Sequence, residues 1–537
     1  MNAVNDVRTI NEIETIIIGT VQYYLPADIK ELQLLINEAR HKQKKIRIRG
    51  SYHSVPAAVD SDSDGLFVML SHMNKVVIDK SKKIVTVEAG CHLGYDKVDP
   101  TGTSTPGNSL FVQLDVAGFA LPDMGGIIHQ TVGGFLSTGA AGGSLKDTFN
   151  ESLQEFTFIP ADKDFPDPIT VSCSDLNTDL FYAMGVSMGL LGIIVSATFS
   201  IIPRFNIRGK ELTTTFSDCS IDMSGLNQGS KKSLHDFLLQ TDFKRLFWYP
   251  QPRVSKVVVW QARKMQPDED EYFIRKPYKE LSRSNQVFAG IVFRIIGHSS
   301  WIATSRFWNK LFYTYIFPAI LFLFVRLDKK DAKEKPVPRI TFEDYWYSSL
   351  PMDNSISDKL FPVKFTELWI PFDDDAPKDI VAEVLQELNN LFQVMYKDGE
   401  VPHPGGDFCI ELVAGKKSKF WMSPAYGSKN VLRVDVFWFG KNAGSPSECY
   451  YPLFWNALQK FNFRCHWGKY LPDANGSQGA HYLRSLYPRW DDFMNLRKKY
   501  DPENIFLTAY WKEHLGLQSA VNSTSPPRRG HFINRHQ

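Results

Sequence analysis

Cysteine is scarce in this sequence, with six residues among 537 and no Cys-x-x-Cys spacing. Scattered cysteines of this kind argue against a zinc site or a disulfide scaffold and are typical of a reducing compartment. The N-terminus also lacks a basic stretch followed by an apolar core, so it predicts no secretory signal. We therefore expect a cytoplasmic protein.

A surplus of one charge is missing as well, because the formal net charge is only +2. Binding to nucleic acid phosphates relies on a strong basic surplus, so this balance excludes a strong electrostatic case for such a partner. A chain of 537 residues exceeds what one hydrophobic core usually supports, which indicates two domains.

The apolar run at Leu311 to Val325 is shorter than the roughly twenty residues that a bilayer-spanning helix needs. It is uncharged and contains Pro318, and basic residues flank it at Arg306, Lys310, Arg326, Lys329 and Lys330. This pattern predicts peripheral membrane contact, with Val287 to Ile296 packed beside the run. The alternative is a buried helix of the second domain.

Residues 49–54 follow a short alternating stretch, residues 45–48, of the kind that forms a strand. A strand that stops at a glycine and continues through small hydroxylated residues turns backbone N–H groups toward a phosphate-bearing cofactor. The alternative is an ordinary turn with a histidine that packs or faces water. The candidate cofactor-binding residues here are Arg49, Gly50, Ser51, Tyr52, His53 and Ser54.

Residues 118–144 are dense in glycine and alanine. Such residues bury little apolar area, so their density indicates that the backbone must approach a planar ring and a pyrophosphate closely. Interleaved apolar residues such as Val132 and Phe135 favour a buried loop over a surface loop. The candidates in this segment are Gly133, Gly134, Ser137, Thr138, Gly139, Gly142 and Gly143.

These two segments resemble the flavin-binding motifs of the vanillyl-alcohol-oxidase superfamily. Three further segments narrow the resemblance to the L-gulonolactone, D-arabinono-1,4-lactone and alditol oxidases. They are residues 179–194, which resemble the element ending the flavin domain, the His-Trp-Gly-Lys sequence at 466–469, and the Asp-Pro-x-x-x-Phe-Leu sequence at 501–507. The resemblance covers roughly residues 15–515 and is weakest at about 210–360.

The resemblance implies an α+β, two-domain flavoprotein with a PCMH-type FAD-binding domain and a cap (substrate) domain built on an antiparallel sheet flanked by helices. The expected parts are an FAD-binding domain at 1–205, a cap domain at 206–480 with an apolar insertion at 287–325, a returning segment at 481–515 and a flexible tail at 516–537. Hydrophobic periodicity predicts cap strands near residues 365–370, 408–413 and 431–437, and a helix at 377–396.

The resemblance also assigns roles to single residues. His53 stands where related oxidases bind the flavin covalently, so we expect an 8α-histidyl FAD, and Gly192 and Ile194 are expected to contact it. Tyr52 departs from the family, which has glycine there. Lys469 and His466 are expected beside the substrate: a cation stabilises charge on the reduced ring, and either group takes the hydroxyl proton if it is neutral.

Glu411 matches a substrate-binding glutamate of the family, but the arginine that follows two residues later is replaced by Val413. This change removes a guanidinium fork, so the substrate preference can differ from that of a sugar lactone oxidase. The alternative for Glu411 is a pair with a neighbouring lysine on the sheet surface. A second departure is Ala140-Ala141, where relatives have a Thr-His pair.

The implied activity is FAD-dependent oxidation of a CH–OH group of a sugar-derived lactone or polyol. Hydride passes to flavin N5, and dioxygen is the acceptor, giving hydrogen peroxide. Two alternatives remain open. One is a membrane-associated dehydrogenase that passes electrons to a quinone or cytochrome, which the run at Leu311 to Val325 favours. The other is a catalytically idle flavin-binding protein, for which Val413 and Ala140-Ala141 argue.

Overall fold

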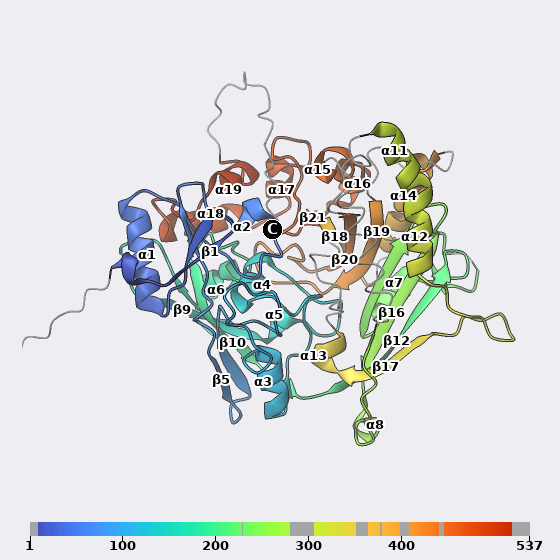
Figure 1. Cartoon of the computed structure of the whole chain (residues 1–537), viewed down its shortest axis with the longest axis horizontal. Coiled ribbons are helices and arrows are strands. Elements are labelled where there is room, and N and C mark those ends of the chain that lie inside the picture. The colour runs from blue at the N-terminus through green and yellow to red at the C-terminus, as the bar shows by residue number, and fades with distance from the viewer. Residues whose placement is uncertain are drawn as a thin grey trace, which may run out of the picture.

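The computed structural model describes residues 9–517 except 165, 228, 280–304, 351–362, 376–377, 398–406 and 440–444. The predicted stretch Val287 to Ile296 and all but the first two residues of the predicted tail lie outside the described residues. In Figure 1 the N-terminal elements, in blue and cyan, and the last helices, in red, form one side of the molecule. A large green-to-orange sheet forms the other side.

The first sheet has the order β1-β2-β4-β3 and carries the strand that leads into residues 49–54. Its strands are β1 (Thr15–Ile18), β2 (Val21–Tyr24), β3 (Ile46–Ile48) and β4 (Leu66–Val68). Helix α1 (Ile29–His41) begins after Asp28, whose side chain accepts a hydrogen bond from Glu31 N. Before this helix the chain forms a hairpin of β1 and β2, because Gly19 turns the chain with φ +66°.

The second sheet has the order β5-β6-β10-β8-β9. Its strands are β5 (Val76–Asp79), β6 (Ile84–Glu88), β8 (Leu153–Ile159), β9 (Ile169–Ser172) and β10 (Ile193–Ser200). The glycine-rich segment forms helix α4 (Val132–Thr138), which packs against β6 and β10 through the buried Val132, Phe135 and Leu136. The neighbouring elements are α2 (Pro56–Val59), α3 (Leu110–Ala117), β7 (Phe119–Ala120), α5 (Phe149–Ser152), α6 (Asp179–Met184) and β11 (Ile202–Pro203).

The third sheet has eight strands in the order β17-β12-β16-β15-β19-β20-β18-β21, and all neighbours are antiparallel. The strands are β12 (Asn206–Thr215), β15 (Phe243–Tyr249), β16 (Lys256–Lys264), β17 (Ile340–Tyr345), β18 (Val363–Phe372), β19 (Asp407–Gly415), β20 (Asn430–Phe439) and β21 (Arg464–Cys465). They include the three strands that the sequence predicted for the cap domain.

Helices cover one face of this sheet and leave the other face to the N-terminal side of the molecule. Helix α14 (Ile380–Met395) packs on the covered face, where its Phe392 ring lies 4.9 Å from the ring of Trp248 on β15. It matches the described part of the helix predicted at 377–396. The other helices of this part are α7 (Leu234–Gln240), α8 (Pro267–Asp270), α13 (Trp346–Ser349), α15 (Pro446–Cys449) and α16 (Tyr451–Leu458).

The last described helices, α17 (Ala480–Ser485), α18 (Trp490–Tyr500) and α19 (Ala509–His514), lead the chain back to its N-terminal elements (Figure 1). Ile46 N donates to Ile505 O at 2.9 Å, and Trp511 Nε1 donates to Ala58 O at 3.0 Å. Buried Asp501 accepts hydrogen bonds from two backbone N–H groups, those of residues 505 and 506. The limits of the domains stay a prediction, although these contacts agree with a returning segment.

The apolar run forms a continuous helical segment of α11 (Arg306–Leu311), the π-helical turn η2 (Phe312–Ile316) and α12 (Phe317–Phe324). Arg306–Phe324 is long and apolar enough to cross a membrane. Of its most apolar stretch of 18 residues, 39% is buried inside the protein. Phe317 and Leu321 are buried, whereas Ile316 and Leu323 are exposed. The buried-helix alternative therefore holds for one face of the segment only.

Candidate active site

A cavity of about 460 Å³ lies between the N-terminal elements and the uncovered face of the eight-stranded sheet. All three predicted catalytic residues, Glu411, His466 and Lys469, line it. Most of the predicted cofactor-binding residues line it too, namely Arg49, Gly50, Ser51, Tyr52, His53, Ser54, Gly133, Gly134, Ser137, Thr138, Gly192 and Ile194. Segments that are hundreds of residues apart in the sequence therefore share one cavity.

Gly139, Gly142 and Gly143 are not among the residues that line the cavity. Gly139 ends α4 in the left-handed conformation, with φ +77°. A Cβ at Gly142 would lie 2.2 Å from Met124 O, and one at Gly143 would lie 2.7 Å from Lys244 O. These glycines allow close packing, and their predicted role in binding the cofactor has no support from the cavity lining.

The loop of residues 49–54 and the His-Trp-Gly-Lys sequence touch each other directly. Val55 N donates to Gly468 O at 2.8 Å, and Lys469 Nζ donates to His53 O at 3.0 Å. The His53 ring packs edge-to-face on His129, with ring centroids 4.3 Å apart. The ammonium from the C-terminal motif is thus held by the backbone of the residue predicted to bind the flavin.

Tyr52 has φ +65°, which explains why the family uses glycine at this position. A left-handed conformation costs a non-glycine residue about 1–2 kcal/mol. Two contacts hold its side chain: the hydroxyl donates to Asp60 Oδ2 at 2.8 Å, and Arg49 Cζ lies 3.9 Å from the ring centroid. The additional bulk is therefore accommodated in the cavity wall.

The residues present fit a flavin nucleotide. A Cβ on Gly50 would lie 2.4 Å from Thr131 Oγ1, so the turn after β3 packs against the residue that precedes α4. Ser51 Oγ is buried without a hydrogen-bond partner among the described residues, and it lies in the loop that lines the cavity. Small residues and an unsatisfied hydroxyl suit a planar ring and a phosphate-bearing chain at close range.

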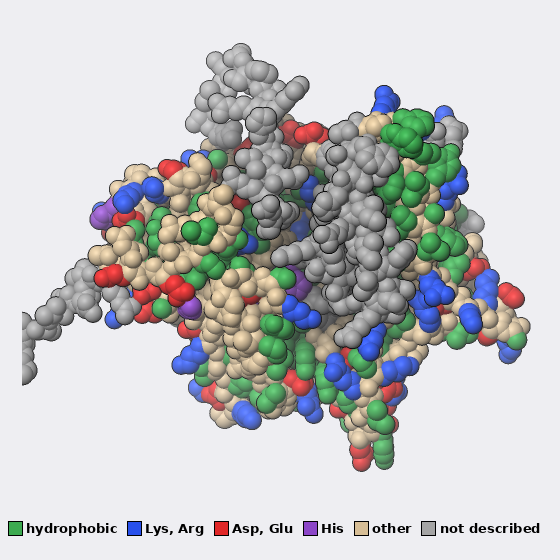
Figure 2. Space-filling view, in the orientation of Figure 1, with side chains coloured by type: hydrophobic (Ala, Val, Ile, Leu, Met, Phe, Trp, Pro, Cys, Tyr) green, Lys and Arg blue, Asp and Glu red, His purple; other side chains and the backbone are tan. Residues whose placement is uncertain are grey.

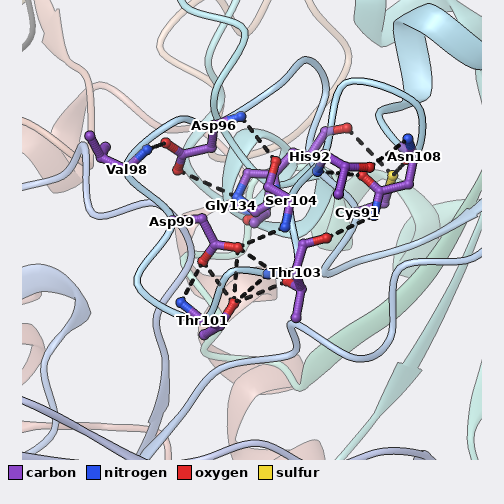
Figure 3. Close-up of polar contacts among 12 residues, drawn as sticks. Cys91, His92, Asp96, Val98, Asp99, Thr101, Thr103, Ser104, Asn108 and Gly134 are labelled. Atoms are coloured by element: carbon purple, nitrogen blue, oxygen red, sulfur yellow. Dashed lines mark hydrogen bonds and ion pairs between the residues drawn. The ribbon is translucent and has the colours of Figure 1, made fainter.

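A further part of the cavity wall comes from residues 91–104, which the sequence analysis did not select. His92, Asp96 and Asp99 line the cavity. Figure 3 shows the polar contacts that hold this loop, with Gly134 beside it: Ser104 N donates to Asp99 Oδ2 at 2.8 Å, and Asp96 N donates to Ser104 Oγ at 3.0 Å. Burial opposes ionisation of Asp96 and Asp99, but the hydrogen bonds outweigh it and lower the pKa of both carboxyl groups.

Three carboxylates lie in adjacent strands on the uncovered face of the sheet. Glu411 of β19 is in register with Asp435 of β20, which is in register with Glu367 of β18. All three side chains are buried and line the cavity. Residues in register on neighbouring strands present their side chains on the same face, so the register alone brings the three acids together.

Glu411 pairs with an arginine inside the cavity, because Arg245 Nε lies 2.5 Å from Glu411 Oε1. The side chains of Arg245 and Glu411 are 15% and 9% exposed. The alternative of a lysine pair on the sheet surface is therefore wrong. Arg245 and Phe247 point into the cavity from β15, whose intervening residues face the covering helices.

A second guanidinium lies in register with Val413. Arg433 of β20 is opposite this valine, and its side chain lines the cavity. Its Nη2 lies 2.9 Å from Asp435 Oδ2 and 3.4 Å from Glu367 Oε2. The arginine that the resemblance leads one to expect at position 413 is thus present one strand away.

Sequence reasoning missed Arg245, Glu367, Arg433 and Asp435. For three of them a signal existed: Glu367 interrupts the apolar strand predicted at 365–370, and Arg433 and Asp435 occupy alternate positions of the strand predicted at 431–437. Alternate positions of a strand point to the same face, so these charges had to share one. Which face they share, and with what, depends on the tertiary structure.

Burial and nearby charges act differently on Asp435 and Glu367. Burial raises the pKa of Asp435 well above its ordinary value, and the attraction to Arg433 does not offset this. Burial also opposes ionisation of Glu367, but the charges of His466, Arg433 and Lys469 outweigh it and lower the pKa of Glu367. Two acids in adjacent strands therefore have pKa values shifted in opposite directions.

His466 is a neutral imidazole at physiological pH, because burial lowers its pKa to about 4. Gly468 N donates to His466 Nδ1 at 3.1 Å. This contact makes Nδ1 the acceptor, so the ring proton resides on Nε2. His466 therefore has a hydrogen-bond donor left to offer, and its acceptor nitrogen is occupied.

Comparisons with known proteins agree with this architecture. Residues 21–95 match a model described as an FAD binding domain, and residues 197–514 match the D-arabinono-1,4-lactone oxidase family. L-gulonolactone oxidase of Mus musculus is 23% identical over 91% of this chain and 93% of its own length. D-arabinono-1,4-lactone oxidase of Saccharomyces cerevisiae is 27% identical over 45% of this chain and 41% of its own.

Solved structures show the same fold. Cholesterol oxidase from B. sterolicum has a TM-score of 0.68 at 14% identity and covers 92% of this chain and 94% of its own. Glucooligosaccharide oxidase from Acremonium strictum, which carries a 6-S-cysteinyl, 8α-N1-histidyl FAD, has a TM-score of 0.59 at 15% identity, with 91% of each chain covered. The predicted α+β fold, an FAD-binding domain with a second domain, is confirmed. The chain is an FAD-linked oxidoreductase and belongs to the D-arabinono-1,4-lactone oxidase family.

Proposed function

We propose that this enzyme oxidises a CH–OH group of a sugar-derived lactone or polyol, with dioxygen as the acceptor and hydrogen peroxide as the product. The observation that carries the proposal is the position of Lys469: its ammonium lies 3.0 Å from His53 O, in the cavity that Glu411 and Arg433 line from the other side. The relatives named L-gulonolactone oxidase and D-arabinono-1,4-lactone oxidase support the lactone as donor.

FAD, when bound, supplies the hydride acceptor. The residues proposed to hold it are the loop 49–54, Gly133 and Gly134, the hydroxyls of Ser137 and Thr138, and Gly192 with Ile194, which all line the cavity. Lys469 supplies a positive charge that stabilises the negative charge developing on the ring, and a fixed cation is most effective where water is excluded.

The hydroxyl proton of the substrate needs an acceptor. His466 is poorly placed for this role, because its Nδ1 already accepts a hydrogen bond from Gly468 N. We assign it instead to orienting a substrate oxygen through Nε2–H. Glu367 is a carboxyl group of the cavity wall with a lowered pKa, and it lies among His466, Arg433 and Lys469, so it is the proposed proton acceptor.

Arg245 with Glu411 and Arg433 with Asp435 are proposed to bind the substrate's other oxygens. Each pair combines the N–H groups of a guanidinium with the oxygens of a carboxyl group. Together they offer hydrogen-bond donors and acceptors to a polyol or a lactone ring. Because Arg433 is buried and held by two acids and Ala141 O, its fork is already oriented before the substrate arrives.

The proposed function is tested by measuring hydrogen peroxide formed per substrate consumed. An oxidase yields one peroxide per oxidised CH–OH group. Near-zero peroxide with rapid reduction of an electron-accepting dye would instead establish the dehydrogenase. If no lactone or polyol bleaches the flavin under anaerobic conditions, the protein is a catalytically idle flavin-binding protein.

We propose that the flavin is linked covalently through His53, as in the histidyl-FAD of the structural neighbour. In His53→Ala, flavin is expected to leave the polypeptide on acid precipitation, because no imidazole remains at the attachment position. The matched control is His129→Ala, which removes the ring packed on His53 and should keep the flavin attached. Flavin that stays bound to precipitated His53→Ala protein shows the linkage to be elsewhere.

We also propose peripheral membrane contact through Leu311 to Val325. Figure 2 shows a hydrophobic patch where Figure 1 places α11 and α12, with basic side chains beside it. The exposed side chains of this segment are Phe307, Trp308, Tyr315, Ile316, Phe322 and Leu323. Together with flanking lysines and arginines, such a face suits the interface of an anionic bilayer.

The double variant Ile316→Asp, Leu323→Asp is expected to lose flotation with vesicles that contain anionic phospholipid, because two charges would have to enter the interface. Val116→Asp is the control, since Val116 is 83% exposed on α3, away from this patch. Equal flotation of the wild type and the double variant would show that this segment does not bind the membrane.

A further inference from the structure

The cavity continues beyond the charged groups into an apolar part, here called the apolar arm. The arm is lined by Phe247, Tyr249, Val258, Leu321, Phe324, Val325, Val363, Phe365, Phe408 and Phe437. None of these residues is among those proposed above to hold the flavin or to bind the oxygens of the substrate. An aromatic wall of this kind leaves apolar area against water unless a ligand covers it.

The change from polar to apolar follows the strands. On β20, Asp435 is followed two residues later by Phe437, and on β18, Glu367 is preceded two residues earlier by Phe365. Phe437 and Phe365 are in register, and their rings stack with centroids 4.8 Å apart. The antiparallel register thus aligns an apolar row directly beside the row of acids.

The apolar arm begins at the reactive groups. Lys469 Nζ lies 4.1 Å from the ring centroid of Phe365. The wall continues over β15 and β19, where Tyr249 and Phe408 have ring centroids 5.7 Å apart. A ligand that reaches Lys469 with its polar end therefore has the aromatic wall within reach of its other end.

Helix α12 closes the far end of the apolar arm. Leu321 and Phe324 point into the cavity from this helix, and Val258 meets them from β16. Lys256 Nζ donates to Phe322 O at 2.9 Å and to Val325 O at 2.7 Å, which holds the end of the helix to the sheet. The Lys256 ammonium thus binds carbonyl oxygens of the helix and does not face the cavity.

Four charged or polar residues also line this end of the cavity: Glu211, Thr213, Arg326 and Arg339. The Tyr278 hydroxyl donates to Glu211 Oε2 at 2.5 Å, and Arg339 Nε lies 4.0 Å from Asp328 Oδ1. Burial raises the pKa of Glu211 to about 7, so it is only partly charged at neutral pH. Aromatic and aliphatic side chains thus outnumber the polar ones in the lining of the apolar arm.

We propose that the apolar arm binds an apolar group carried by the substrate. The substrate class is then an amphipathic CH–OH compound, with a polyol or lactone head at Lys469 and an aliphatic or aromatic substituent under α12. This inference rests on the proposed function for the head group and goes beyond it for the substituent. Each methylene that enters the arm is expected to strengthen binding about fourfold.

The test compares kcat/KM for L-gulono-1,4-lactone and its 6-O-methyl to 6-O-hexyl ethers with the flavin-loaded enzyme. A rise of roughly threefold or more per methylene supports the arm. Oxidation of the parent lactone with no gain from the alkyl chain overturns the arm and leaves the proposed function standing.

Straight-chain alkanols from butanol to octanol separate the two proposals. If the arm exists, they perturb the visible absorbance of the bound flavin at concentrations that fall with chain length, whether or not any lactone is oxidised. Perturbation by alkanols without lactone oxidation therefore overturns the proposed function and keeps the arm. Absence of both effects overturns both.

A matched pair of variants on α12 locates the arm. Phe324 lines the cavity, whereas Phe322, two residues earlier, is 47% exposed on the outside. Phe324→Gln is expected to lower the ratio of kcat/KM for the hexyl ether to that for the parent lactone about tenfold, and Phe322→Gln is expected to keep it. Equal ratios in the two variants place the alkyl chain elsewhere and overturn the assignment.

Discussion

Lys469→Ala is expected to slow anaerobic reduction of the flavin by roughly a hundredfold or more. The ammonium lies 3.0 Å from His53 O and 4.1 Å from the ring centroid of Phe365, so it is held at the junction of the cofactor loop and the substrate cavity. We propose that its charge stabilises the reduced ring, which carries more negative charge than the oxidised ring. Stopped-flow absorbance of the flavin measures the change.

Lys460→Ala is the control for this experiment. Lys460 belongs to the same C-terminal region but is 58% exposed and pairs with Glu387 on the surface. Its removal should leave the reduction rate unchanged, because an exposed pair contributes little. A Lys469→Ala enzyme that reduces at the wild-type rate would show that this lysine does not act on the ring.

Arg433→Met is expected to destabilise the protein by about 3–5 kcal/mol and to abolish most activity, because it leaves two buried acids without the guanidinium that contacts them. Arg433 Nη2 contacts both Asp435 and Glu367, and all three side chains are buried. Methionine keeps much of the length and packing of the side chain. The losses of stability and activity therefore result from the missing charge. Thermal unfolding measures the first and flavin-reduction kinetics the second.

The pH dependence of the stability loss in Arg433→Met tests whether the missing charge causes that loss. Glu367 has a lowered pKa, so its ionised form contributes stability that is present above its ordinary pKa and is lost as the pH falls through the lowered value. Arg433→Met removes part of that contribution, so the difference in Tm between wild type and variant should be largest near neutral pH and shrink as the pH falls from the ordinary pKa of a glutamate toward the lowered value.

The control is Arg464→Met. Arg464 is also largely buried, but among the described residues its guanidinium donates only to backbone carbonyls, those of Leu486, Pro424 and Tyr426. Its loss should lower Tm by an amount that hardly varies with pH, because no carboxylate depends on it. A pH-independent difference for Arg433→Met as well would contradict the proposed ion-pair role.

Much of the fold could be predicted from local patterns. Alternating apolar residues located the strands near residues 365, 408 and 431, and helical spacing located α14. The hairpin before α1 was missed because a two-residue turn at Gly19 leaves little local signal beyond one glycine. Helix α4 was missed because glycine is a poor helix former, and here tertiary packing of Val132 and Phe135 overrides that preference.

The candidate site was also predicted only in part, because contacts between distant segments depend on the tertiary structure. His53, Lys469, His466 and Glu411 stand in motifs whose residue order is visible in the sequence, and the structure places all four in one cavity. The partner of Glu411 was not visible, because Arg245 lies on a strand far away in the sequence and meets it only through the pairing of β15 with β19.

By itself, the sequence predicted a flavin-binding loop around His53 and determined a glycine-rich second segment, a C-terminal lysine motif and a valine at position 413. Only the tertiary structure decided that Arg433 lies in register with Val413, that three acids share one row, and that an apolar wall begins where that row ends. The physical reason is register: strand pairing between distant segments is set by packing over the whole sheet, and a shift of one residue would turn every one of these side chains to the other face.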